Sequence, residues 1–124
     1  MSKFVKVKTQ LRDLNLIKQA LDDLKLNYAE NATFVHMWSA FRGQVPLVVK
    51  VNHAQFGLRA TDSGDYEVIG DDMQMKVIRK ELDQIQQRYA YHAVRQATAQ
   101  AGFELVEENV GRDQVIRLTV RRWS

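Results

Sequence analysis

The residues best suited to metal binding or proton transfer are three histidines, His36, His53 and His92. Each lies in a different expected element of secondary structure. None has a second histidine or an acid three or four residues away, the spacing that places two metal ligands on one face of a helix. The spacing therefore predicts no metal site, and we expect no cofactor.

Other catalytic patterns are also missing from the sequence. The six glycines are isolated, so there is no glycine-rich phosphate-binding loop, and no serine lies in a Gly-x-Ser-x-Gly pattern. For the paired carboxylates Asp22–Asp23, Asp71–Asp72 and Glu107–Glu108 we expect capping or solvated roles rather than catalytic ones. The pattern disfavours enzymatic activity. A small-molecule enzyme stays as a third alternative, which a deep pocket around Arg59 and His92 would support.

The densest group of versatile side chains is the segment Arg88-Tyr89-Ala90-Tyr91-His92. On a helix, Arg88, Tyr91, His92 and Arg95 would fan around neighbouring faces, because residues four apart are adjacent. Tyrosine and arginine are favoured anchors of interfaces, so these four residues are the predicted contact surface for a protein partner. The alternative is that Tyr89 and His92 pack against the sheet with their polar tips satisfied.

The net charge of +3 is unevenly distributed along the chain. The first 12 residues carry four cations and no acid, and residues 110–124 carry four arginines and one acid. If the terminal strands lie side by side, one edge of the sheet is basic and could meet phosphates, an acidic protein or only water. The candidate nucleic-acid contacts are Lys6, Lys8, Arg117, Arg121 and Trp123, with Phe4 and Tyr28 as nearby aromatic residues.

A long helix must position the Arg88–Arg95 group. The segment from Lys76 to Phe103 has no proline, and no glycine before Gly102. Its apolar residues recur at intervals of three or four, at Ile78, Leu82, Ile85, Tyr89, Ala93, Ala97 and Ala101. This spacing predicts an amphipathic helix that ends at a Gly102 cap, with the rest of the chain packed against it.

The N-terminal part predicts a strand followed by a helix. Residues 3–9 alternate with period two, as a half-buried strand does. Asp13 is the expected N-cap of a helix over residues 14–25.

The middle of the chain is rich in β-branched and aromatic residues separated by turn residues. Strands are predicted at 33–40 and 47–51 around a turn at 42–44. Two more are predicted at 56–61 and 66–69 around a turn at 62–65, where Gly64 tolerates a positive φ. The last two strands are predicted at 103–108 and 115–123, around a turn at 111–113.

These elements predict the α+β class: an antiparallel sheet, ferredoxin-like or a related meander, packed by one shorter N-terminal helix and one long helix near residues 73–101. With 124 residues, 45% of them hydrophobic and 27% charged, we expect a single domain over 1–124. The absence of cysteine excludes disulfides and thiolate metal ligands. The N-terminus does not resemble a signal peptide and no apolar run would span a membrane, so a cytoplasmic location is expected.

Several segments carry a family resemblance. They are the opening Met1 to Leu14, the segment Gln87-Arg-Tyr-Ala-Tyr-His92, Gly102-Phe103 with Val106-Glu-Glu108, and the closing Ile116-Arg-Leu with Arg122-Trp123. Together they resemble the plastid and cyanobacterial "hypothetical chloroplast reading frame thirty-five" family, whose function is unknown. The chain departs from the family after Gly70, where relatives tend to be rich in tryptophan. The resemblance implies the cytosol or stroma of a photosynthetic organism, a copy in a cyanobacterial phage being equally compatible, and it implies no catalytic residues.

The first functional expectation is a small, non-catalytic accessory or regulatory module that binds an unidentified protein partner. The second is a nucleic-acid binder that uses the basic terminal strands and whose affinity falls steeply with salt. Strand addition at an exposed sheet edge would also allow a dimer.

Overall fold

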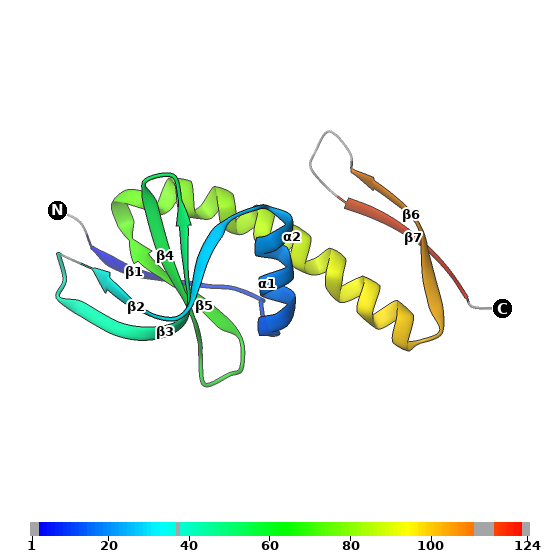
Figure 1. Cartoon of the computed structure of the whole chain (residues 1–124), viewed down its shortest axis with the longest axis horizontal. Helices are drawn as coiled ribbons and strands as arrows, with labels where there is room; N and C mark the ends of the chain where they lie inside the picture. Colours follow the sequence, from blue (N-terminus) through cyan, green and yellow to red (C-terminus); the bar gives the residue numbers. More distant parts are fainter. Residues whose placement is uncertain (1–2, 37, 111–115, 123–124) are drawn as a thin grey trace.

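A computed structural model describes residues 3–36, 38–110 and 116–122 (Figure 1). The elements are β1 (Phe4–Lys8), α1 (Leu14–Asp23), β2 (Asn27–His36), β3 (Phe41–Val51), β4 (Ala54–Ala60), β5 (Tyr66–Asp71), the 3₁₀ turn η1 (Asp72–Gln74), α2 (Met75–Gln100), β6 (Phe103–Val110) and β7 (Ile116–Arg122). Figure 1 shows α2 running from the sheet at one end of the molecule to the β6–β7 hairpin at the other.

The first five strands form one antiparallel sheet, in the order β1-β5-β4-β3-β2, and β6 pairs with β7 in a second sheet of two strands. The predicted α+β class, the antiparallel sheet and the two helices of unequal length are confirmed. Consecutive strands from β2 to β5 are neighbours, so the main sheet is the meander rather than the ferredoxin-like arrangement. The turn predicted at 111–113 lies outside the described residues.

Helix α1 begins where its sequence predicts, because the Asp13 carboxylate accepts hydrogen bonds from the backbone N–H groups of Asn15 and Leu16. Its buried face packs into a core that it shares with the sheet and α2. The main core consists of Ile17, Ala20 and Leu21 from α1, Leu47, Val49, Phe56, Leu58 and Val68 from the sheet, and Ile78, Leu82 and Ile85 from α2. Gly64 takes φ +89° in the β4–β5 turn, as predicted.

Helix α2 is longer than the core it covers. The predicted apolar stripe is buried at Ile78, Leu82 and Ile85, but Ala97 and Ala101 at its other end are exposed. Gly102 ends the helix with φ +84°, as expected for a cap. The second half of α2 therefore extends beyond the main sheet, and the β6–β7 hairpin lies alongside it (Figure 1).

The predicted turn at 42–44 is wrong, because Arg42, Gly43 and Gln44 belong to β3 and pair with β2. The chain turns at residues 38–40 instead, where Ala40 takes φ +59°. Gly43 is needed for packing rather than for turning. A Cβ added there would lie 3.2 Å from Cζ of the Phe41 ring.

The β2–β3 hairpin bends back over the sheet face opposite the helices. The bend falls where Asn31, with φ +49°, lies across from Pro46 and the ladder skips one pair. Although β1 and β3 are separated by two strands, the rings of Phe4 and Phe41 stack with centroids 4.4 Å apart. A second core of Phe34, Val45, Val48 and Ile69 fills the space beneath the hairpin.

Replacing Gly57 tests this second core. A Cβ at Gly57 would lie 2.9 Å from Ile69 Cγ1 and 3.4 Å from Val45 Cγ2. We expect Gly57→Ala to lower the free energy of unfolding by about 1–3 kcal/mol through overpacking, as measured by urea denaturation. Gly43→Ala is the control and should cost less, because its new methyl meets only a half-buried ring. A Gly57→Ala variant as stable as the wild type would contradict the closed hairpin.

Candidate functional site

The predicted helix cluster lies where α1 packs against the second half of α2. Asp23, the last residue of α1, brings two of the four predicted residues together. Its Oδ2 atom lies 2.5 Å from His92 Nε2, 3.0 Å from Arg88 Nε and 2.9 Å from Arg88 Nη2. One carboxylate oxygen therefore joins the end of α1 to two successive turns of α2.

A second polar contact joins the other end of α1 to the same helix. The Tyr89 hydroxyl accepts hydrogen bonds from the backbone N–H groups of Arg12 and Asp13, both at 3.0 Å. The expectation that the polar tips of Tyr89 and His92 are satisfied is confirmed. Together, Tyr89 and His92 fix α1 on α2 at both of its ends.

Tyr91 does not form part of an exposed contact surface, which corrects the prediction. Only 8% of the residue is exposed. The Arg88 guanidinium lies over its ring, 4.5 Å from the centroid, and the His92 ring meets it edge-on at 5.0 Å. Tyr91 lies in the part of α2 that extends past the main sheet. The spacing of the apolar residues that face the main core therefore did not predict its burial.

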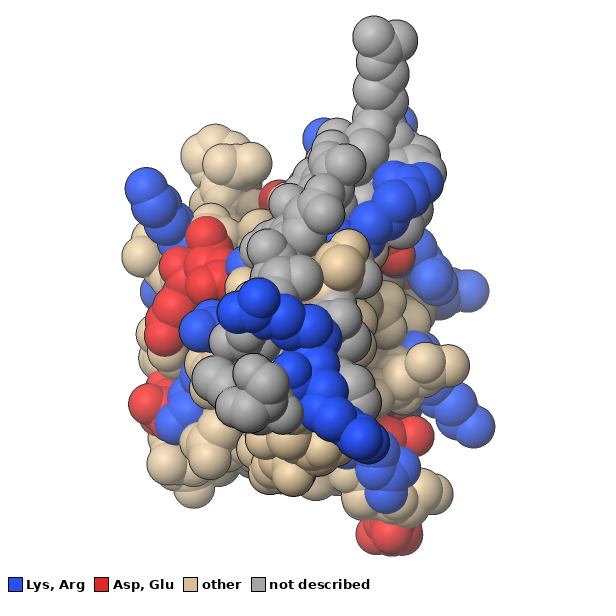
Figure 2. Space-filling view, turned by 90° about the vertical axis from the view of Figure 1, so that its right-hand side faces the viewer, with Lys and Arg blue, Asp and Glu red and all other residues tan. Residues whose placement is uncertain are grey.

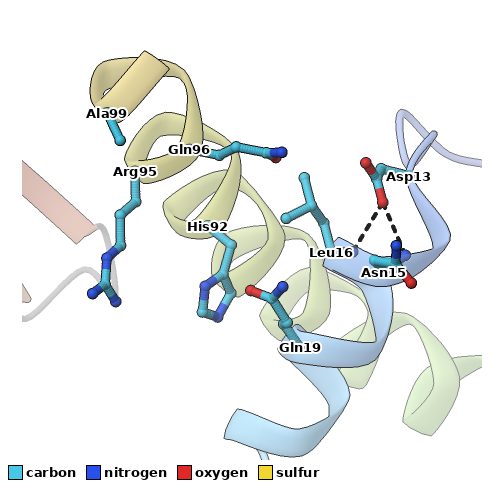
Figure 3. A pocket seen from close by; sticks show the side chains of 8 residues that line it. All are labelled: Asp13, Asn15, Leu16, Gln19, His92, Arg95, Gln96 and Ala99. Carbon is cyan, nitrogen blue, oxygen red and sulfur yellow. Dashed lines mark hydrogen bonds between the residues drawn. The ribbon is translucent and has the colours of Figure 1, made fainter. Parts of the chain in front are cut away.

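A groove between α1 and α2 lies beside this cluster (Figure 3). Its volume is about 470 Å³, within the range of ligand sites in proteins. It is lined by Asp13, Asn15, Leu16, Gln19, His92, Arg95, Gln96 and Ala99. Figure 3 shows Gln96 extending from α2 towards α1, whereas Arg95 extends from α2 on the side away from α1. The groove is polar, with amide side chains on both of its walls.

The electrostatics of the cluster favour an ionised Asp23. Partial burial of its carboxylate raises the pKa, but the hydrogen bonds and charges of His92 and Arg88 outweigh this effect. The net result is a pKa below the ordinary value of 3.8. Asp23 therefore occupies the donors of Arg88 and His92, and Arg95 is the groove's exposed cation.

Sequence reasoning missed the role of Asp23, for which a solvated role was expected. Its partners lie 65 and 69 residues further along the chain, so no local pattern identifies them. The amide residues of α1 were missed for the same reason. Asn15 and Gln19 become part of a site only because α1 packs on α2.

A second cluster lies beneath the β2–β3 hairpin and was also missed. Ser39 Oγ lies 2.6 Å from His36 Nδ1, and the other ring nitrogen, Nε2, lies 3.0 Å from Asp71 Oδ2. His36 is 3% exposed, and Asp71 also accepts a hydrogen bond from the N–H of Met73. His36 and Ser39 are close in sequence, but Asp71 reaches them only because the hairpin bends over β5.

Arg59 and His92 do not line a common pocket, the observation that would have supported a small-molecule enzyme. Arg59 lies on the sheet face beneath the hairpin, 5.4 Å from the Phe41 ring centroid, and pairs with Glu67 at 2.8 Å. His92 is on α2, which packs on the other face of the sheet. Among the described residues, no group of three His, Cys, Asp or Glu side chains could hold a metal ion.

The predicted nucleic-acid residues fall into two separate groups. Lys6 and Lys8 are exposed on β1, which pairs with β5, whereas Arg117 and Arg121 are exposed on β7, which pairs with β6. The terminal strands do not lie side by side, which was the condition for a single basic edge, because β1 and β7 belong to different sheets at opposite ends of the molecule (Figure 1). Figure 2 shows Lys and Arg side chains running across the hairpin end. Trp123 lies outside the described residues.

The fold and the groove define a small α+β protein with a helix pair on one face of an antiparallel meander. The family model described as "Protein of unknown function (DUF1257)" matches residues 20–119, and the chain belongs to this family. In the part of the chain that the structure describes, no helix is long and apolar enough to cross a membrane.

Relatives similar over their full length are each named "Uncharacterized protein ycf35". The one from Pyropia yezoensis is 31% identical over 128 residues, covering 100% of this chain and 99% of the relative. Those from Guillardia theta and Cyanophora paradoxa are 29% and 28% identical, and each alignment covers 99% of this chain and 98% of the relative. These matches confirm the family resemblance seen in the sequence. No solved structure matches the chain.

The low pKa of Asp23 makes the α1–α2 contact dependent on pH. A carboxyl group with a lowered pKa in the folded state stabilises the protein above its unfolded-state pKa, and this contribution is lost as the pH falls through the folded-state value. Asp23→Asn should therefore be less stable than the wild type near neutral pH, and the difference should narrow below pH 3.8. Urea denaturation across this range measures the difference.

Asp22→Asn controls for the general effect of removing a carboxylate from α1, because Asp22 contacts Tyr28 instead of α2. A stability difference for Asp23→Asn that stayed constant down to about pH 2.5 would contradict the assigned ion pair.

The Tyr89 hydroxyl gives a second test of the contact. Tyr89→Phe leaves the N–H groups of Arg12 and Asp13 without this acceptor, and we expect a loss of about 1–2 kcal/mol in the free energy of unfolding. Tyr28→Phe is the matched control, since it removes one exposed hydrogen bond to Asp22 and should change stability by less than about 0.5 kcal/mol. Equal effects of the two substitutions would show that Tyr89 does not position α1.

Proposed function

We propose that the protein is an accessory module that binds a partner protein, and that the α1–α2 groove holds an extended segment of that partner. The observation that supports this proposal most strongly is the groove itself, with a volume of about 470 Å³ and polar side chains on two helices fixed to each other by Asp23 and Tyr89. A rigid groove loses little conformational freedom when it binds.

The chemistry of the lining favours a peptide. Asn15, Gln19 and Gln96 carry side-chain amides, each of which offers both donors and an acceptor. A peptide main chain likewise presents alternating N–H and C=O groups, whereas a phosphate presents acceptors only. Amide side chains on facing walls can therefore hydrogen-bond an extended segment along its length.

The charge of the groove narrows the class of partner. Arg88 and His92 already share the Asp23 carboxylate, and Asp13 caps its own helix. Arg95 is exposed at the groove edge. An acidic residue placed where the bound segment leaves the groove would pair with Arg95, so the proposed occupant is a segment of a partner protein with a carboxylate at that position.

Binding to nucleic acid is the second candidate, supported by the arginines of the hairpin end (Figure 2). Two observations place it behind protein binding. The basic strands β1 and β7 belong to different sheets. In addition, residues 103–122 contain four acids as well as four arginines, so the hairpin segment has no net charge. Binding through this segment would therefore gain little from the release of counterions, which requires an excess of cations that neutralise phosphates.

The proposed setting is the cytoplasm of a cyanobacterium, the plastid stroma, or the cytosol of a phage-infected host. Its support is membership of the family to which the ycf35 relatives belong.

We also propose a single domain over residues 1–124. Dimers formed at the exposed edge strand β2 would be compatible with the groove.

Affinity capture with the tagged protein tests the function. The lysate comes from cells that carry the gene, at low and high salt, with and without nuclease. We expect one defined protein to be retained in all four conditions. Arg95→Glu should reduce its retention about tenfold or more, because the change removes the cation and places like charges together.

Lys80→Glu is the matched control, since it makes the same charge change at an exposed position of α2 outside the groove. Equal retention by the two variants would exclude the groove as the binding surface. Loss of every partner at high salt or after nuclease would instead support nucleic-acid binding through the hairpin end.

A further inference from the structure

Beneath the β2–β3 hairpin, a hydroxyl, an imidazole and a carboxylate form a continuous hydrogen-bonded chain. Ser39 Oγ lies 2.6 Å from His36 Nδ1, and His36 Nε2 lies 3.0 Å from Asp71 Oδ2. We propose that Ser39 is an activated nucleophile that accepts an acyl group from short-chain esters, with His36 as its base and Asp71 as the residue that orients the base. This site is separate from the α1–α2 groove and independent of the function proposed for it.

The surroundings of Asp71 select the imidazole tautomer that the reaction needs. Asp71 Oδ1 accepts a hydrogen bond from Met73 N–H at 2.7 Å, so Oδ2 is the oxygen that faces the ring. An ionised carboxylate only accepts hydrogen bonds, which places the imidazole proton on Nε2. In the neutral ring, Nδ1 is then the acceptor for the hydrogen bond of the Ser39 hydroxyl.

Packing holds the base in position. His36 is 3% exposed, and the edge of its ring meets Phe4 with centroids 5.8 Å apart. Ser39, by contrast, is exposed in the turn at residues 38–40 and can meet a reactant. The N–H of Phe41 donates to its Oγ at 3.3 Å, and the neighbouring Ala40 has φ +59°. A positive φ in a residue with a side chain is a local strain of the kind that recurs at functional sites.

The arrangement has the roles of a Ser-His-Asp triad with the two ring nitrogens exchanged. In the serine hydrolases Nε2 faces the serine and Nδ1 the acid. Either imidazole nitrogen can accept a proton while the other donates to a carboxylate. What the chemistry requires is the continuous chain from hydroxyl to carboxylate, which this structure has.

A small cavity lies beside the base and the acid of the triad, and Ser39 is outside its lining. Its volume is about 150 Å³, below the ~300–1,000 Å³ of sites for larger ligands, which favours a short acyl chain. Phe34, Val35 and Trp38 give it apolar walls, and His36, Gln55, Asp71 and Gln74 complete the lining. The N–H of Gln55 donates to Gln74 Oε1 at 3.2 Å and so fixes that amide.

The proposed reaction balances with an ester and water as the only reactants. Ser39 Oγ bonds to the carbonyl carbon while its proton moves to His36 Nδ1. The carbon–oxygen bond to the leaving alcohol then breaks, and that alcohol takes the proton from Nδ1, which leaves Ser39 acylated. Water, giving a proton to the same nitrogen, later attacks the acyl carbon and releases the carboxylic acid and the free serine.

The full-length protein is treated with a fluorophosphonate probe, whose phosphorus bonds to an activated serine with loss of fluoride. Peptide mass spectrometry should find the adduct on Ser39, and Ser39→Ala should remove it. Ser63→Ala is the matched control, because Ser63 is exposed in another turn and should leave labelling unchanged. Slow release of p-nitrophenol from p-nitrophenyl acetate should depend on the same residue.

Asp71→Asn separates activation from folding. The asparagine Oδ1 can still accept the Met73 N–H, but its amide group would donate to His36 Nε2 and force the proton onto Nδ1. Labelling should then fall about tenfold or more in protein that remains folded, as a cooperative melting transition shows. No adduct on the folded wild type, an adduct on another serine, or labelling that Asp71→Asn does not slow would each overturn the proposal.

Discussion

The candidate groove depends on the way α1 is fixed to α2. Burial of Ile17 and Leu21 holds the helix in the core, but hydrophobic burial has no direction and does not define its rotation. Direction comes from Asp23 at one end of α1, which binds His92 and Arg88, and from the Tyr89 hydroxyl at the other. Because both contacts are made by residues of α2, the two walls of the groove have a defined spacing.

On the opposite face of the sheet, apolar burial and a polar contact likewise act together, and the element that they position is the β2–β3 hairpin. The bend opposite Pro46 brings the Phe41 ring onto Phe4 and closes a second core. The hydrogen bond between His36 and Asp71 orients the hairpin on β5, and Ser39 in the hairpin turn contacts the His36 ring. Each candidate site thus lies where an apolar contact brings two distant segments together and a hydrogen-bonded carboxylate, Asp23 or Asp71, orients them.

Sequence patterns predicted the features that local chemistry determines. Asp13 as a cap, Gly64 in its turn and the long helix each depend on residues within a few positions. Gly43 was wrongly predicted to lie in a turn. It lies in β3, where the absence of a side chain leaves room for the Phe41 ring, and this contact is not visible in the local sequence. Within the site, the clustering of Arg88 and His92 followed from helical spacing. The role of Asp23 did not, because its partners lie 65 and 69 residues further along the chain.

The most direct test of the central claim, that the groove binds a partner protein, is photo-crosslinking in cells. A photoreactive residue replaces Gln19, Gln96 or, outside the groove, Lys80 in otherwise intact protein. The account predicts an adduct with the same single protein from positions 19 and 96, on the two facing helices, and none from position 80. Adducts equally frequent at all three positions, or none from either groove position, would contradict it.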